Sequence, residues 1–425
     1  MLQYSGVLFF YQPDTGGEYL VAVGAAAEAE MYRKVVYMML VVLFPLLGYA
    51  QSDIDVDFDD NGVVDLQDLV ALTQAFGSNQ AKYDLHPDGV IDIKDLILFA
   101  SAYNQRDTSE VVLITEEVKE QEASAEVKFF ELLTANSWPN DLAIDPRGYI
   151  WFTEMRANAI GQLEPRTDII RRFSLTTPGA QPHSIALDGQ GHVWFTEIAA
   201  NRIGLLNPFS DEIQEFTVPT PGSRPMSLQF DDQWKLWFIE SAANRIARLD
   251  PVTETIKEFS IGEQDVALGS LQIDDSGQVW FVDHEQSLLG MLNPETEEVT
   301  TFLLPHAGLA IGQMGLDSQG RMWFADTDST RLGMFDSTTR QARYFRFPEK
   351  MESPHALQVD SNDRVWVGGQ SSGWLTSFSL QDTTFTLYEI SDGDVEVKNL
   401  RVDRRGVVWI VDSEGNRIGR IETSD

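Results

Sequence analysis

Tryptophan recurs with a fixed period in the C-terminal part of the chain, in a region rich in short runs of alternating apolar and polar residues. The seven members are 43 residues apart: Trp151, Trp194, Trp237, Trp280, Trp323, Trp366 and Trp409. Aspartate keeps the same phase six residues earlier: Asp145, Asp188, Asp231, Asp274, Asp317, Asp360 and Asp403. Short alternating runs separated by turn residues are typical of β-strands. A repeat of this length predicts an all-β, seven-bladed β-propeller over residues 127–425.

Each repeat divides into four predicted strands. A turn such as Asp145-Pro-Arg-Gly148 leads from the innermost strand to the strand that carries the tryptophan. The outermost strand carries an aromatic residue: Phe173, Phe216, Phe259, Phe302, Phe345 or Tyr388. One period before Phe173 lies Phe130, so residues 127–133 are expected to supply the outer strand of the last blade. That strand would close the ring and remove its open sheet edges.

The repeat P-x-x-I…D-x-x-G-x-x-W-F-T-E…N-x-I-G is similar to that of the virginiamycin B lyases. The resemblance covers residues 127–425 and implies the seven-bladed propeller of that family. The founding enzyme of the family opens streptogramin B rings by magnesium-assisted elimination at an ester. The aspartate and tryptophan of every repeat are interpreted as turn and core residues, because a catalytic site needs asymmetry.

One apolar run, at residues 35–48, lies near the N-terminus and follows Arg33 and Lys34. It is shorter than the roughly 20 residues of a membrane-spanning helix. Gly48-Tyr49-Ala50 has the small residues of a signal-peptide cleavage site. We therefore expect a signal peptide over residues 31–50 that begins at Met31, a secreted mature protein and no membrane span. Residues 1–30 are interpreted as a misassigned start.

Two loops between the apolar run and the propeller carry oxygen ligands at the spacing of EF-hand calcium sites, with Gly62 and Gly89 at the sharp turn. The first loop predicts ligands at Asp57, Asp59, Asn61, Val63, Asp65 and Asp68, and the second at Asp84, His86, Asp88, Val90, Asp92 and Asp95. Val63 and Val90 would contribute backbone carbonyl groups. His86 stands where a carboxylate or amide is usual, so the second site is expected to be weaker.

Each loop runs into an amphipathic segment, and the pair resembles a dockerin module over residues 52–105. The resemblance implies a small α-helical, Ca²⁺-binding module that docks onto a cohesin-bearing scaffold, typically in an extracellular polysaccharide-degrading assembly. The alternative is a calcium-stabilised fold without a cohesin partner. Residues 106–126 are acidic and without aromatic side chains, which predicts an extended linker.

The composition narrows the function classes. With 66 acidic and 31 basic side chains the formal charge is −35, which argues against binding to nucleic acid or to an anionic membrane surface. The chain has no cysteine. A disulfide scaffold, a cysteine-ligated zinc site and a thiol nucleophile are therefore excluded.

Candidate chemistry lies where the repeats differ. Eleven residues before each tryptophan the chain has Asn140, His183, Met226, Gly269, Gly312, His355 and Lys398. Three residues after it stand Glu154, Glu197, Glu240, Asp283, Asp326, Gly369 and Asp412. Counting from the hairpin turn puts the two sets opposite each other at one mouth of the central channel. The carboxylates there predict a Mg²⁺ or Ca²⁺ site, or alternatively loop caps and salt bridges to arginines.

The histidines are the candidate catalytic bases, because an imidazole beside a carboxylate is suited to removing a proton. In the lyase family the catalytic blade carries Pro-His with a metal-binding glutamate fourteen residues later, which Pro182-His183 and Glu197 match. Gln181 replaces the second glutamate of that pattern. His355 also follows a proline, but it lacks both carboxylates.

Three functions follow from these residues. The first is a metal-assisted lyase or hydrolase that acts through His183 and Glu197. The second is a non-catalytic propeller that holds a small molecule or glycan, where Lys398 could bind an anionic ligand and exposed Trp234 or Trp374 could stack on sugar rings. The third is a gluconolactonase-like hydrolase, in which Asn140 and Glu154 would matter more.

Overall fold

The chain separates into two compact units, Met1–Asp107 and Thr108–Asp425, which we describe one at a time. The computed structural model describes residues 118–262, 267–283, 288–304, 311–327, 330–370, 372–390 and 395–424, the strands at 7–10, 19–22 and 112–115, and single residues between 58 and 95.

In the N-terminal unit, β1 (Val7–Phe10) pairs antiparallel with β2 (Tyr19–Ala22). Phe58, Leu72 and Ile91 are buried, as is Asp95. The predicted signal peptide lies outside the described residues, and so do the predicted calcium ligands other than Val90 and Asp95. Export, the helical dockerin-like module and calcium binding therefore stay predictions. Within the described part of the chain, no helix has the length and apolar character needed to cross a membrane.

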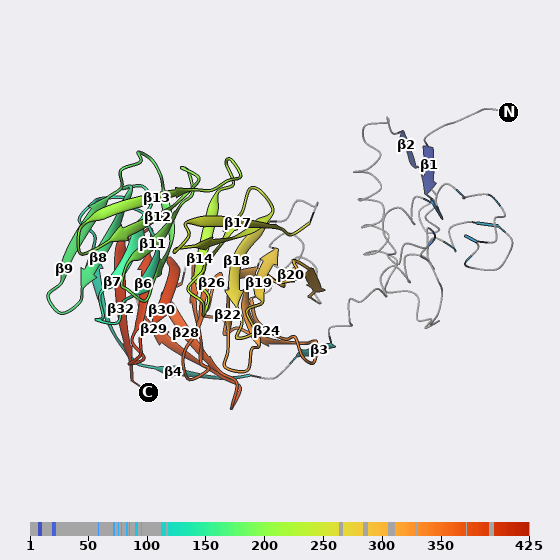
Figure 1. The fold of residues 1–425 in the computed structure, drawn as a ribbon. Helices are drawn as coiled ribbons and strands as arrows, with labels where there is room; N and C mark the ends of the chain where they lie inside the picture. The colour runs from blue at the N-terminus through green and yellow to red at the C-terminus, as the bar shows by residue number, and fades with distance from the viewer. Residues whose placement is uncertain are drawn as a thin grey trace. The chain divides into compact units, whose positions relative to one another are not determined.

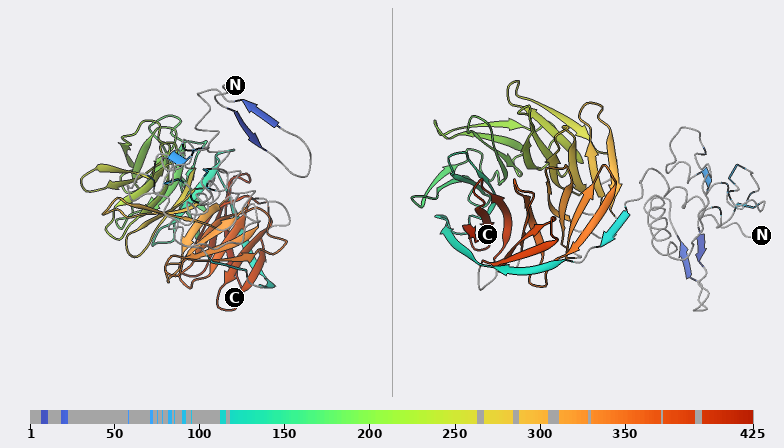
Figure 2. Two further views of the ribbon diagram at one scale, coloured as in Figure 1. Left: turned by 90° about the vertical axis from the view of Figure 1, so that its right-hand side faces the viewer. Right: turned by 90° about the horizontal axis from the view of Figure 1, so that it is seen from below.

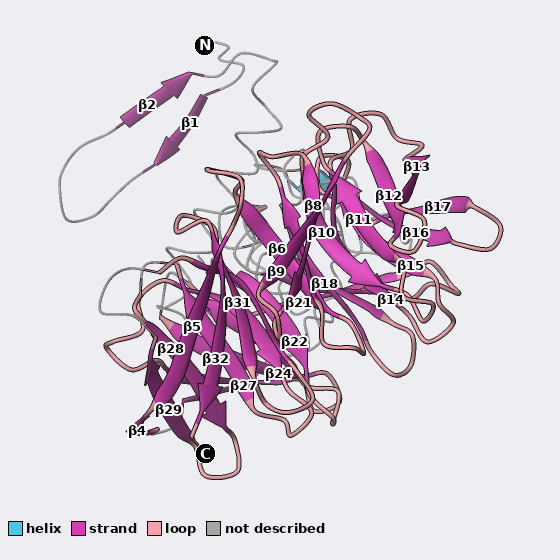
Figure 3. Cartoon of the chain, turned by 90° about the vertical axis from the view of Figure 1, so that its left-hand side faces the viewer, coloured by secondary structure: helices cyan, strands magenta, loops and turns pink. Residues whose placement is uncertain are grey.

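The C-terminal unit is a seven-bladed β-propeller, as the 43-residue period predicts (Figures 1 and 3). The innermost strands are β6 (Pro139–Ile144), β10 (Pro182–Leu187), β14 (Pro225–Phe230), β18 (Leu268–Ile273), β22 (Ile311–Leu316), β26 (Pro354–Val359) and β30 (Val397–Val402). The second strands are β7 (Ile150–Glu154), β11 (Val193–Glu197), β15 (Leu236–Glu240), β19 (Val279–Asp283), β23 (Met322–Asp326), β27 (Val365–Gly369) and β31 (Val408–Asp412).

The outer half of each blade completes its antiparallel sheet. The third strands are β8 (Ala159–Glu164), β12 (Arg202–Asn207), β16 (Arg245–Asp250), β20 (Leu288–Leu292), β24 (Arg331–Asp336), β28 (Trp374–Ser379) and β32 (Arg417–Thr423). The fourth strands of blades 1–6 are β9 (Ile169–Ser174), β13 (Glu212–Thr217), β17 (Thr255–Ser260), β21 (Val299–Leu303), β25 (Gln341–Arg346) and β29 (Thr384–Glu389). In the seventh blade, β5 (Ala125–Glu131) takes this place and pairs with β32.

The second strand of every blade is buried along its whole length, which explains why each begins with three consecutive apolar residues. The outer strands, which face solvent on one side, alternate instead, as in β13 and β17. Each tryptophan stacks on the aromatic residue of its own outer strand; the ring centroids of Trp194 and Phe216 are 5.5 Å apart. The period thus places one aromatic pair in the core of each blade.

The recurring aspartate ties the hairpin turn to this core. Asp188 Oδ1 accepts hydrogen bonds from the backbone N–H groups of Gln190 and His192, and its Oδ2 accepts the indole N–H of Trp194 at 3.1 Å. Blade 1 differs, because Asp145 Oδ2 binds the Arg147 side chain and the buried indole nitrogen of Trp151 has no hydrogen-bond partner. Trp409 in blade 7 is likewise without an indole partner.

The segment before β5 differs from the linker that its acidity predicts. β3 (Val112–Thr115) pairs in parallel with β25, and β4 (Lys119–Ala123) pairs in parallel with β29. Both add a fifth strand to a blade, and Figure 2 shows the segment following the outside of the ring. Backbone hydrogen bonding explains the difference, because β25 and β29 would otherwise present unpaired edges.

Candidate ligand site in the central channel

The inner strands enclose a cavity of about 690 Å³ along the propeller axis. Its lining includes Asn140, His183, His355 and Lys398. These residues belong to blades 1, 2, 6 and 7, which are consecutive around the ring. Gly269 and Gly312 hold the same repeat position in blades 4 and 5, so the polar side chains form an arc on one side. We call this set of four the polar arc.

The predicted carboxylate ring does not line this cavity. The structure pairs Glu154 with Pro139 and Glu197 with Pro182, where counting from the turn pairs them with Asn140 and His183. The register shifts at a β-bulge within each innermost strand, after the proline. A register shift of one residue moves a side chain to the other face of a strand. The carboxylates therefore do not face the polar arc.

The carboxylates are instead buried inside the blades: Glu154, Glu197, Glu240, Asp283, Asp326 and Asp412 are each at most 2% exposed. Arginines partner two of them directly, since Arg172 Nε lies 3.4 Å from Glu154 and Arg417 Nε lies 2.7 Å from Asp412. The cation site predicted at these six residues therefore stays a prediction, and the salt-bridge alternative describes Glu154 and Asp412.

Glu197 and Glu240 share a different arrangement. Burial and a neighbouring carboxylate, Glu215 or Glu258, raise the pKa of each to about 7. The two side-chain oxygens of Glu197 are buried without a hydrogen-bond donor, and so are those of Glu240. Burial without a donor favours the protonated form of each glutamate. Glu197 thus has Glu215 as its neighbour, and the group that contacts His183 Nδ1 is the Ser184 hydroxyl.

A catalytic magnesium ion of the kind the family resemblance implies does not fit this channel. Asp141 is the one carboxylate among the cavity-lining residues, and its oxygens are taken by four donors. Gln181, which replaces the second glutamate of the family pattern, is exposed. The positive charge beside Glu197 and Glu215 comes from Arg202. Among the described residues, no group of three or more histidine and carboxylate side chains is arranged to hold a metal.

His183 stands at the end of a hydrogen-bonded chain across three blades. The N–H of Ser227 donates to Ser184 Oγ at 2.8 Å, and Ser184 Oγ lies 3.0 Å from His183 Nδ1. The serine hydroxyl can then donate its hydrogen to Nδ1, so we assign the imidazole hydrogen to Nε2. The His183 carbonyl accepts the Asn140 amide and the Thr153 hydroxyl, both at 3.0 Å. Ring and backbone are both fixed.

Positive charge surrounds this imidazole. Burial, together with Lys398 and Arg224, lowers the pKa of His183 to about 4, so the ring is neutral at physiological pH. Glu396 is the acidic neighbour of Lys398, and burial raises the pKa of that carboxyl. The cavity therefore presents a neutral imidazole N–H and the side chain of Lys398, within a chain of net charge −35.

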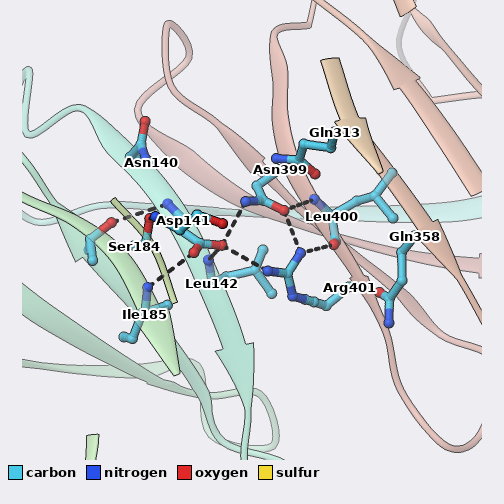
Figure 4. Close-up of polar contacts among 12 residues, drawn as sticks. Asn140, Asp141, Leu142, Ser184, Ile185, Gln313, Gln358, Asn399, Leu400 and Arg401 are labelled. Carbon is cyan, nitrogen blue, oxygen red and sulfur yellow. Dashed lines mark hydrogen bonds and ion pairs between the residues drawn. The ribbon is translucent and has the colours of Figure 1, made fainter. Parts of the chain in front are cut away.

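Deeper in the channel, Asp141 joins three blades (Figure 4). Its Oδ1 accepts Asn399 Nδ2 at 2.6 Å and Arg401 Nη2 at 3.2 Å, both from blade 7, and its Oδ2 accepts the N–H of Ile185 in blade 2 at 3.0 Å. Burial raises the pKa of Asp141, while Arg401 opposes the rise. This network closes the ring from inside the channel.

Sequence analysis missed Asp141, Ser184, Arg224 and Arg401. Asp141, Ser184 and Arg401 lie within three residues of a polar-arc residue, and Asp141, Arg224 and Arg401 differ from their counterparts in the other repeats, whereas Ser184 recurs as Ser227 and Ser270. Tabulating the residue ten before each tryptophan, as well as eleven before, would have singled out Asp141 as the one carboxylate at that position.

The comparisons with known proteins agree with the seven-bladed fold. The family model described as the virginiamycin B lyase family matches residues 113–238 and 211–425. No curated protein sequence matches the chain. Among solved structures, virginiamycin B lyase from Staphylococcus aureus is 22% identical with a TM-score of 0.65, covering 71% of this chain and 100% of its own. A streptogramin B lyase structure gives the same identity and TM-score, over 71% and 98%.

A more distant likeness is the extracellular domain of a putative one-component system from B. thetaiotaomicron, 14% identical with a TM-score of 0.57, over 71% of this chain and 42% of that one. At these identities the solved structures establish the fold. The family model covers most of the chain on its own. The chain belongs to the virginiamycin B lyase family.

Proposed function

We propose that the propeller binds a small organic anion, such as a carboxylate-bearing sugar, at the polar arc of its channel. The observation that carries the proposal is the set of donors in the cavity: Lys398 lines it together with a neutral His183 whose Nδ1 is already occupied by Ser184. Cations and N–H donors are what a carboxylate requires. The cavity, about 690 Å³, has the size of small-ligand sites.

Calorimetric titration with D-glucuronate tests this function, with methyl β-D-glucoside as the neutral control. We expect the wild type to bind glucuronate in preference to the glucoside. Lys398→Met should weaken glucuronate binding by about tenfold or more, because a charge-assisted hydrogen bond is lost. Lys350→Met is the matched control, since Lys350 pairs with Glu122 and lies outside the cavity lining. Equal affinities for glucuronate and glucoside would overturn the proposal.

Lyase chemistry is the second candidate. The position of His183 in the lining of the cavity favours it, because histidine is the side chain most often used as a general acid or base. A catalytically inactive variant of the S. aureus enzyme has been solved with quinupristin. Incubation of this protein with quinupristin and Mg²⁺, followed by chromatography and mass measurement, tests the candidate. Ring opening at unchanged mass that is lost in His183→Ala would support it, and unaltered quinupristin would exclude it for this substrate.

A further inference from the structure

Trp234 breaks the repeat on the face of the propeller opposite the polar arc. It lies in the turn between β14 and β15, whereas Arg224 and Met226 lie at the other end of β14. Five of the other six blades have glycine at this turn position, with positive φ: Gly148, Gly191, Gly277, Gly320 and Gly406. Trp234 adopts the same left-handed backbone, with φ of 59°. A bulky residue is disfavoured in that conformation, so folding alone gives no reason for tryptophan here.

The indole is exposed yet held in place. Trp234 is 53% exposed, and its Cζ2 and Cη2 atoms pack over Gly189 of blade 2, where an added Cβ would lie 2.9 Å from them. The Phe230 ring packs against the Trp234 indole, and the two ring centroids are 5.8 Å apart. A fixed aromatic surface in solvent loses little freedom when it binds a ligand.

The residues around the ring are polar. Gln190, Asp232 and Gln233 are exposed in the two turns that hold Trp234 and Gly189, and Lys235 pairs with Asp250 at 2.8 Å. Amide and carboxylate groups can bind hydroxyl groups as donors and acceptors. The face of an indole is electron-rich and attracts the C–H groups on the flat face of a pyranose ring.

We propose that Trp234 is the stacking platform of a glycan-binding site that takes a sugar ring with equatorial hydroxyl groups, such as a β-linked glucose unit. Gln190, Asp232 and Gln233 would bind its hydroxyl groups. This site is separate from the channel and does not depend on the anion-binding function proposed there. A protein partner is a poorer fit, because a stable protein interface requires about 800 Å² per partner with an apolar centre.

Titration of the full chain with cellohexaose tests the site, with protein-observed NMR as the readout. We expect millimolar or tighter binding by the wild type, at least tenfold weaker binding by Trp234→Gly, and intermediate binding by Trp234→Phe. Trp234→Gly should also raise the melting temperature by about 2 °C, because glycine relieves the left-handed backbone. A raised melting temperature would show that Trp234→Gly is folded, so that its weaker binding would reflect the missing indole.

Val252→Ala is the matched control, because Val252 is 88% exposed in another turn of the same blade. Its cellohexaose affinity should equal that of the wild type. Three results would overturn the proposal: no binding of cellohexaose by the wild type, unchanged binding by Trp234→Gly, or a Trp234-dependent self-association in sedimentation experiments, which would make the ring a protein contact.

Discussion

Asp141 and Arg401 form an ion pair that connects the first blade of the propeller to the last. The Arg401 Nη2 and Asp141 Oδ1 atoms are 3.2 Å apart, although 260 residues of sequence separate the two. At the outer edge of the ring, β5, which precedes the first blade in the sequence, pairs with β32 of the last blade. The ring is thus closed twice, once by backbone hydrogen bonds outside and once by side chains in the channel.

Removing the Asp141 carboxylate should therefore destabilise the whole propeller. Asp141→Ala leaves the Asn399 amide and the N–H of Ile185 without this acceptor and removes the ion pair with Arg401, and we expect a loss of about 3 kcal/mol in the free energy of unfolding. Urea denaturation measures it. The control is Arg405→Met, because the Arg405 side chain is 71% exposed in its pair with Asp403 and should contribute less than about 1 kcal/mol. Equal losses for the two variants would contradict the role given to Asp141.

The indole hydrogen bond predicts a difference between two tryptophans at the same repeat position. Trp237 Nε1 donates to Asp231 Oδ2 at 2.8 Å, whereas the buried Nε1 of Trp151 has no partner. Both substitutions to phenylalanine remove similar volume. Trp237→Phe should nevertheless cost about 1 kcal/mol more than Trp151→Phe, because it alone breaks a hydrogen bond. Chemical denaturation of the two variants measures this difference, and a larger cost at Trp151 would refute the assignment.

The fold could be predicted from the sequence because the residues that recur in each repeat have one structural role each. The Asp188–Trp194 pair and the glycine ten residues after five of the seven tryptophans illustrate this. A Cβ on Gly161 would lie 2.1 Å from the Phe152 ring, so that position has no room for another side chain. Phe130 is in phase with the outer-strand aromatics, and in the structure it pairs with Ile418 of β32.

The site was harder to predict because it depends on a local irregularity. Counting back from the turn puts His183 opposite Glu197, but the bulge after Pro182 shifts the register by one residue. That shift sends Glu197 into the blade and leaves His183 in the channel with Ser184. No turn signal in the sequence marks such a bulge. The parallel pairing of β3 and β4 was also not predicted, because the acidic residues of β4 and of the segment around both strands resemble a linker.

The buried carboxyl of Glu240 makes stability depend on pH. Burial and Glu258 raise its pKa from 4.5 to about 7, so the folded state holds a proton there that the unfolded state releases above pH 4.5. The stabilisation from this group is complete below pH 4.5 and is lost as the pH rises through 7. Glu240→Gln lacks this titration. We expect its melting temperature, relative to the wild type, to be higher at pH 8 than at pH 5.

Glu154→Gln is the control for that comparison. Burial raises the pKa of Glu154 as well, but Arg172 Nε lies 3.4 Å away and opposes the rise, so Glu154→Gln should change the relative melting temperature between pH 5 and pH 8 less than Glu240→Gln does. Thermal unfolding of the three proteins at both pH values gives all the required numbers. If the melting-temperature difference between Glu240→Gln and the wild type were the same at pH 5 and pH 8, Glu240 would not hold the proton.

The polar arc is the central claim, and a crystal structure of the protein soaked with D-glucuronate tests it most directly. We expect the ligand in the channel cavity, with its carboxylate within hydrogen-bonding distance of Lys398 Nζ and of His183 Nε2. The same soak of Lys398→Met crystals should leave the cavity without glucuronate. Glucuronate bound only outside the channel, or bound equally in the Lys398→Met protein, would contradict the account.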